Sequence, residues 1–192
     1  MGIGLSFLVG CGTDYDTTTQ IDPYIQNYIA QSAKFESGYA AYFDFSDGME
    51  YAYKDEQTRK NLSGITHKVT GNNWTVYGLG ENTVEHMTLS QTALYAKVIQ
   101  SRYTAKRAPI EKALDSIVVK KQLSLLITDF EEYGQDYNLK YQAFATADFK
   151  KWLVMGGKIN FFVTDYFERN QPKHLYFIVF DNANDDLTSE VK

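Results

Sequence analysis

The stretch YFDFSDGM, residues 42–49, carries an apolar run that ends abruptly in two aspartates, a serine and a glycine. The run begins at Tyr39 after Gly38, so residues 39–45 are predicted to form a short buried strand. The polar residues behind it predict a turn. Their carboxylate and hydroxyl oxygens could bind a metal ion, or they could only hydrogen-bond the amides of the turn.

A second apolar run, LSLLITD at residues 123–129, is the strongest strand candidate of the chain. Its hydrophobicity is continuous rather than alternating, which is typical of a strand buried on both faces in a parallel sheet. Neighbouring parallel strands end at the same rim of a sheet, so we expect Asp44 and Asp129 to lie close together. Asp165, after a third apolar run, is expected at the same rim but roughly 10 Å from Asp44.

The other segments alternate between helix and strand patterns. Helices are predicted over residues 54–71, 90–101, 108–121 and 141–155, a hairpin over 74–88, and two further strands over 159–168 and 175–180. This order predicts an α/β fold with a doubly wound, mostly parallel central sheet, helices on both faces and an antiparallel edge hairpin. The last two strands are too close in sequence for a crossover helix, so the final strand is expected to pair antiparallel at an edge.

Composition limits the possible functions. The chain has 192 residues, of which 44% are hydrophobic and 15% aromatic, which is enough for one packed domain. A net charge of -5 and the lack of a compact basic patch argue against nucleic acid as a partner. The three histidines lack metal-ligand spacing, and the sequence contains neither a nucleophile elbow nor a phosphate-binding loop.

The single cysteine, Cys11, ends the segment LVGC, residues 8–11, and resembles the lipobox of a bacterial lipoprotein, where the cysteine becomes the lipidated first residue. The apolar run before it is too short to span a bilayer and lacks the basic opening of a secretory signal. Either a basic segment precedes it, or the run is a buried strand with a core cysteine. The acidic residues that follow resemble the surface-export signal of Bacteroidota lipoproteins. We therefore expect an outer-membrane lipoprotein, periplasmic or surface-exposed, whose only membrane contact is the lipid anchor.

These patterns divide the chain into four parts. Residues 1–11 are interpreted as a lipoprotein signal remnant with the lipidated cysteine, 12–37 as a tether and N-terminal helix, 38–182 as the α/β domain, and 183–192 as a polar tail.

The order of elements in the domain is similar to that of a known family. A strand ending in D-x-S-x-G, followed by a helix, a hairpin, more helices and a strand ending in T-D, resembles the von Willebrand factor type A domain. The likeness covers about residues 38–181, but only DFSDGM and LLITD match as motifs. In that family the motif forms a metal-ion-dependent adhesion site, which holds Mg²⁺ and leaves one coordination position for an acidic group of the partner. The resemblance implies a Rossmann-like fold and a divalent-cation site.

The resemblance also implies a set of ligands and shows where they depart from the family. Gly48 replaces the family's second serine, and Ala108 stands where a threonine of the second loop is expected. Mg²⁺ requires near-octahedral oxygen ligands, so the ion is either bound at a weakened site or absent from a metal-free relic. The candidate metal ligands are Asp44, Ser46, Asp129 and Thr104, and the candidate binding rim is Asp47, Gly48, Glu131 and Glu132.

Together these observations predict a non-enzymatic binding module of the cell envelope that recognises a protein or glycan partner, with or without a divalent cation. One alternative is a metal-free structural scaffold of an envelope complex. Another is an Asp-based, metal-dependent phosphohydrolase. The phosphohydrolase motif D-x-D requires a second aspartate where this chain has Ser46.

Overall fold

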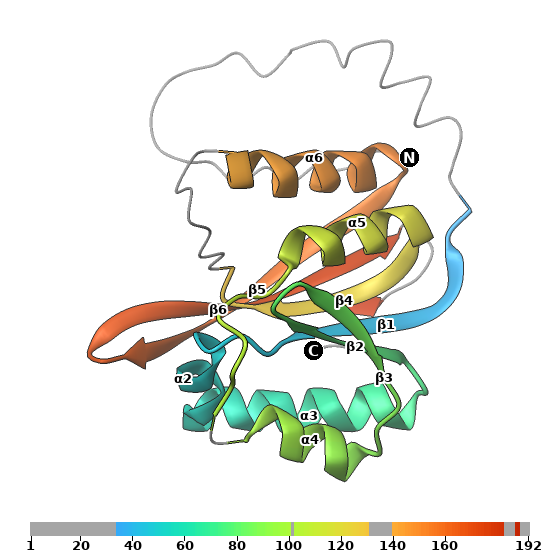
Figure 1. Cartoon of the computed structure of the whole chain (residues 1–192). Helices are drawn as coiled ribbons and strands as arrows, with labels where there is room; N and C mark the ends of the chain where they lie inside the picture. Colours follow the sequence, from blue (N-terminus) through green and yellow to red (C-terminus); the bar gives the residue numbers. More distant parts are fainter. Residues whose placement is uncertain (1–33, 101, 131–139, 183–186, 189–192) are drawn as a thin grey trace.

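The computed structural model describes residues 34–100, 102–130, 140–182 and 187–188. They form a six-stranded mixed sheet with helices on both faces (Figure 1), which confirms the predicted α/β class. In chain order the elements are β1 (Glu36–Asp44), α2 (Met49–Lys54), α3 (Glu56–Gly71), β2 (Thr75–Gly80), β3 (Thr83–Met87), α4 (Gln91–Val98), α5 (Ile110–Lys120), β4 (Gln122–Thr128), α6 (Lys140–Val154), β5 (Gly157–Glu168) and β6 (Gln171–Asn182).

The two strands that were expected to be parallel neighbours are neighbours. The strand order is β3-β2-β1-β4-β6-β5, with β1 in the interior and parallel to both β2 and β4. Phe43 lies opposite Ile127, so β1 and β4 end almost level with each other. The antiparallel hairpin of β2 and β3 forms one edge of the sheet, as predicted.

The second half of the sheet differs from a doubly wound arrangement. β6 is antiparallel to its neighbours, as expected, but it lies between β4 and β5, so the prediction that the last strand forms an edge was wrong. β5 and β6 are each 12 residues long and are joined by Arg169 and Asn170. Both turn residues have positive φ, 47° and 69°, as a tight two-residue hairpin requires. β6 pairs with β5 along its whole length and with β4 on its other side.

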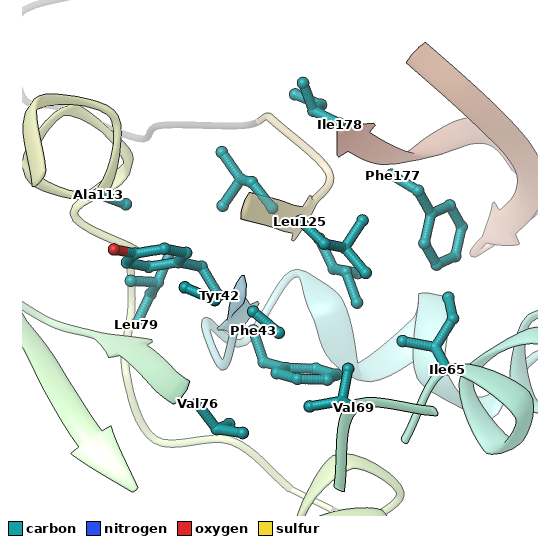
Figure 2. Packing of buried hydrophobic residues seen from close by; sticks show 14 of the residues in the cluster. Tyr42, Phe43, Ile65, Val69, Val76, Leu79, Ala113, Leu125, Phe177 and Ile178 are labelled. Carbon is teal, nitrogen blue, oxygen red and sulfur yellow. The ribbon is translucent and has the colours of Figure 1, made fainter. Parts of the chain in front are cut away.

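Side chains on β1 supply a core to both faces of the sheet. Successive residues of a strand point to opposite faces, and Tyr42 and Phe43 follow this rule: Tyr42 lies toward Ala113 of α5, and Phe43 toward Val69 of α3 (Figure 2). The Tyr42 hydroxyl is 3.4 Å from Ser116 Oγ, and burial raises the pKa of Tyr42 to about 12. Because helices cover both faces (Figure 1), β1 and β4 are continuously apolar rather than alternating.

The ends of the described chain refine the predicted parts. β1 starts at Glu36, two residues before the predicted domain start, while residues 1–33, including Cys11, lie outside the described residues. Within the predicted polar tail, Leu187 is buried, and the amide and hydroxyl of Thr188 donate to Asp181 Oδ2 at 3.1 and 3.0 Å. Part of that tail therefore packs onto the domain. No helix in the described ranges has the length and apolar character needed to cross a bilayer.

Candidate functional site

Asp44 is the last residue of β1, and its carboxylate is buried beneath the loops that follow the central strands. Oδ1 accepts hydrogen bonds from the amide of Ser46 at 2.8 Å and from its hydroxyl at 2.7 Å. Oδ2 accepts from Thr128 Oγ1 at 2.7 Å. Ser46 belongs to the turn after β1 and Thr128 ends β4, so a single side chain ties the ends of two parallel strands together.

The buried environment of the Asp44 carboxylate disfavours its ionised form. Burial raises the pKa of Asp44; the hydrogen bonds from Ser46 and Thr128 lower it, and the nearby Asp47 carboxylate adds to the rise. Burial is the largest of these effects, so the net shift is upward. The hydrogen bonds to both oxygens therefore act mainly to satisfy a group that would be costly to bury without partners.

Asp129 follows β4 directly and reaches the same rim of the sheet, as expected. It is 5% exposed. A Cβ atom added to Gly48 would lie 2.8 Å from Asp129 Oδ2, so the carboxylate occupies the space that a side chain at position 48 would need. Gly48 therefore permits a close approach between the turn after β1 (the first loop, residues 45–48) and the start of the segment after β4 (the third loop, residues 129–130). It also lacks the hydroxyl group of the family's second serine.

The second loop, residues 102–109, runs alongside the first. Ser46 forms a parallel bridge with Ala105, and the amide of Asp47 donates to the Ala105 carbonyl at 2.7 Å. Thr104, a candidate metal ligand, is next to this bridge but its side chain is exposed, in contrast to the buried Asp44 and Ser46. The structure thus brings the second loop to the rim without placing Thr104 in the buried cluster.

Two tyrosines and Thr128 belong to the site and were not assigned to it from sequence. The Tyr53 hydroxyl donates to the Asp44 carbonyl at 2.8 Å, and the ring of Tyr103 packs on Tyr53 at 5.8 Å. Burial raises the pKa of both phenols, and the Asp44 charge adds to the effect. For Thr128 a signal existed, because the T-D ending of the strand was recognised but only its aspartate was assigned. For the tyrosines there was no local signal.

The exposed part of the rim includes the turn between β2 and β3. Glu81 Oε1 accepts from the amide of Lys106 at 3.0 Å, and Asn82 Oδ1 accepts from Arg107 at 3.0 Å. Asp47 is exposed beside them. Four segments, residues 45–48, 81–82, 102–109 and 129–130, therefore form one connected surface, which we call the loop rim. Glu131 and Glu132, also predicted for it, lie outside the described residues.

Asp165 lies farther from Asp44 than the sequence predicted, because two strands, β4 and β6, separate β5 from β1. It lies within β5, which continues to Glu168, and β6 separates that strand from β4. Its carboxylate is exposed and hydrogen-bonds His174 Nδ1 at 2.7 Å across the hairpin.

The buried cluster is a poor fit for the divalent cation that the family resemblance implies. An adhesion-type ion needs ligand lone pairs directed at it and one coordination position open to the partner. Here Asp44 and Ser46 are 0% and 4% exposed, and both Asp44 oxygens accept hydroxyl protons. The hydroxyls of Ser46 and Thr128 hydrogen-bond the carboxylate oxygens of Asp44. Among these three described residues, the arrangement offers no open coordination position.

Comparisons with protein-family models, with curated proteins and with solved structures found no match. The class of the site is therefore defined by its geometry. It is a buried, hydrogen-bonded carboxylate at the carboxyl ends of two parallel strands, surrounded by exposed loops of an α/β domain.

Proposed function

We propose that this chain is a non-enzymatic binding module of a cell-envelope lipoprotein, with a von Willebrand type A-like arrangement of its first four strands. In this proposal the loop rim recognises a protein or glycan partner. The supporting observation is the position of Asp44. Its carboxylate accepts hydrogen bonds from Ser46 in the turn after β1 and from Thr128 at the end of β4, and the bridge between Ser46 and Ala105 adds the second loop. Loops held by a rigid scaffold are well suited to recognition.

The burial of Asp44 disfavours the phosphohydrolase alternative. A nucleophile in such an enzyme must reach a phosphoryl group, and a metal ligand must direct a free lone pair at the ion. Asp44 is fully buried, and both of its carboxylate oxygens accept hydrogen bonds. Asp44 is therefore proposed as a positioning residue that organises the loop rim from below, while the exposed Asp47 and Thr104 are proposed to face the partner.

A site-specific crosslinking experiment tests this assignment. A photoreactive amino acid is placed at Asp47, at Thr104, or at the control position Asn72, which is exposed near the opposite ends of the strands. In the native cell envelope, the two rim positions should capture the same species and Asn72 should not. Capture of that species from Asn72 with equal yield would refute the loop rim as the binding surface.

The purified partner then allows a quantitative test. Asp47→Arg should weaken its binding at least tenfold, because a charge reversal at the centre of an interface disrupts complementarity. A chelator should leave binding unchanged if Asp44 is structural. Binding that is abolished by chelator would support the metal-dependent version, and binding insensitive to both changes would support the scaffold alternative.

The proposed lipidation is tested separately. The protein is expressed with its native upstream region, and cells are fed an alkyne-labelled fatty acid. Wild type should incorporate the label and sediment with membranes, whereas Cys11→Ser should do neither. Equal labelling of both proteins would contradict the lipobox interpretation.

A further inference from the structure

A cavity separate from the loop rim lies between α3 and the hairpin of β5 and β6. Its volume is about 350 Å³, near the lower end of the usual range for small-molecule pockets. The floor is apolar: Phe162 and Phe177 are direct partners across the two strands, and Ile65 of α3 lies close to Phe177 (Figure 2). Such a floor can hold an aromatic ring by face or edge contacts.

A glycine on α3 keeps the cavity open. Lys60, Gly64 and Lys68 recur at intervals of four residues, so they lie in one row along the helix. A Cβ atom added to Gly64 would meet nothing within 4 Å. The absence of a side chain in the middle of this row leaves room between the two lysines.

The charge around the cavity is positive, although the whole chain carries a net charge of -5. Lys60 and Lys68 line it, and no acidic residue is among the described residues of the lining. Lys60 pairs with Glu56 at 2.9 Å on the exposed helix surface. Lys68 is half-buried and forms no ion pair within the described parts of the chain. Its ammonium group is therefore available to an incoming anion.

A polar pair completes the lining. Asn61 Nδ2 donates to Thr164 Oγ1 at a long 3.4 Å, joining α3 to β5. The lining thus combines an aromatic floor, an amide and hydroxyl pair, and a free ammonium group. A few convergent polar groups over an apolar base are the usual composition of a small-molecule site.

We propose that this cavity binds a small organic carboxylate with an aromatic body. The ring lies on Phe162 and Phe177, and the carboxylate bonds the Lys68 ammonium group in a charge-assisted interaction. This site is independent of the loop rim and of the function proposed for it, because none of its lining residues belongs to the four rim segments.

Three compounds with the same ring test the proposal on the full chain: indole-3-acetate, tryptamine and 3-methylindole. All three contain an indole ring, and its substituent is negatively charged in indole-3-acetate, positively charged in tryptamine and uncharged in 3-methylindole. Titration monitored by protein NMR should give a dissociation constant on the order of 1 mM for indole-3-acetate, as expected for a ligand of this size. Tryptamine and 3-methylindole should bind at least tenfold more weakly. Equal binding of all three, or no binding of indole-3-acetate, would overturn the proposal.

Matched variants locate the binding. Lys68→Gln should weaken indole-3-acetate at least fivefold, whereas Lys120→Gln, a lysine of α5 on the other face of the sheet, should leave it unchanged. Gly64→Leu should abolish binding by filling the cavity, with Gly64→Ala as the control for a change in the helix backbone. Circular dichroism checks that each variant is folded. If Gly64→Leu kept full affinity for indole-3-acetate, or if Lys68→Gln and Lys120→Gln lost affinity equally, the ligand would bind elsewhere on the protein.

Discussion

Replacing Asp44 by alanine removes the acceptor of three buried donors. The Ser46 amide, the Ser46 hydroxyl and the Thr128 hydroxyl all lie 2.7 to 2.8 Å from its carboxylate oxygens. A buried donor left without an acceptor costs about 1–3 kcal/mol. The Ser46 hydroxyl can rotate, but the amide is fixed by the backbone. We therefore expect Asp44→Ala to lower the free energy of unfolding by about 3–5 kcal/mol.

Asp44→Asn is the matched control because it keeps the shape and removes the charge. Its amide oxygen can accept from Ser46 as the carboxylate does, and its NH₂ group can donate to Thr128 Oγ1, which can exchange its donor role for an acceptor role. Burial raises the pKa of Asp44, so the loss of a buried charge offsets part of the loss in hydrogen-bond strength. The asparagine variant should stay within about 1.5 kcal/mol of wild type.

Urea unfolding at pH 7, followed by tryptophan fluorescence, measures both differences. In a thermal scan the alanine variant should melt roughly 6–20 °C lower, at 2–4 °C per kcal/mol for a domain of this size. Hydrogen exchange should show faster opening at residues 45–48 and 102–107. An alanine variant within about 1 kcal/mol of wild type would refute the role of Asp44 as an organising centre. An asparagine variant as unstable as alanine would show that the charge itself is required, as a metal ligand would require.

Three further predictions concern pH and two glycines. Because the raised pKa of Asp44 makes the native state hold this proton more tightly, its contribution to stability is present below about pH 4 and is lost as the pH rises through the raised pKa. We therefore expect the free energy of unfolding of wild type, relative to that of Asp44→Asn, to fall as the pH rises. Urea unfolding curves recorded at a series of pH values measure this difference, and a rise would contradict the prediction. Gly64→Ala should raise the free energy of unfolding by about 1 kcal/mol in a thermal melt, because alanine favours the middle of a helix over glycine and the added Cβ would meet no atom within 4 Å. A loss of stability would show that the added methyl group is crowded. Gly157→Ala should lower stability by about 2–3 kcal/mol, because its Cβ would lie 2.2 Å from Trp152 Nε1, and a neutral result in the same melt would refute this packing.

The central part of the fold was predictable because its sequence signal has a direct physical cause. Strands β1 and β4 are covered on both faces, so their residues are continuously apolar, and the two runs stood out in sequence. The hairpin of β2 and β3 was marked by a short turn between β-prone segments. In each case the property that made the prediction possible is local to the segment itself.

The place of β6 was not predictable in the same way. A pattern of apolar residues shows that a strand is buried, but it does not show which strand pairs with it. β6 is buried along Phe177–Asn182 because it lies between β4 and β5, whereas the edge strand β5 exposes Phe161, Val163 and Phe167. The sequence-based expectation placed the more apolar strand at the edge. The sequence of β5 did not reveal its edge position, because most of the residues that it exposes at every second position are apolar.

At the candidate site, the predictable contacts were again the local ones. The bonds from Ser46 to Asp44 span two residues and follow from the tendency of aspartate to accept from nearby backbone and hydroxyl groups. Thr128 and Tyr53 reach Asp44 from other elements, 84 and 9 residues away in sequence. Only the alignment of β1 with β4 and the packing of α2 bring them there.

The same local contacts explain why a D-x-S-x-G loop does not by itself indicate a metal site. In this chain the aspartate and serine close the turn after β1 through their own hydrogen bonds. In this chain there is also little free space around the fifth position of the motif, Gly48. Here the Asp129 carboxylate lies 2.8 Å from the point where a Gly48 Cβ would be, so a serine introduced at that position would first have to displace a buried carboxylate before its hydroxyl could act as a ligand. A ligand hydroxyl at position 48 of this chain would therefore require a different packing between the first and third loops, and a motif of five residues does not specify that packing.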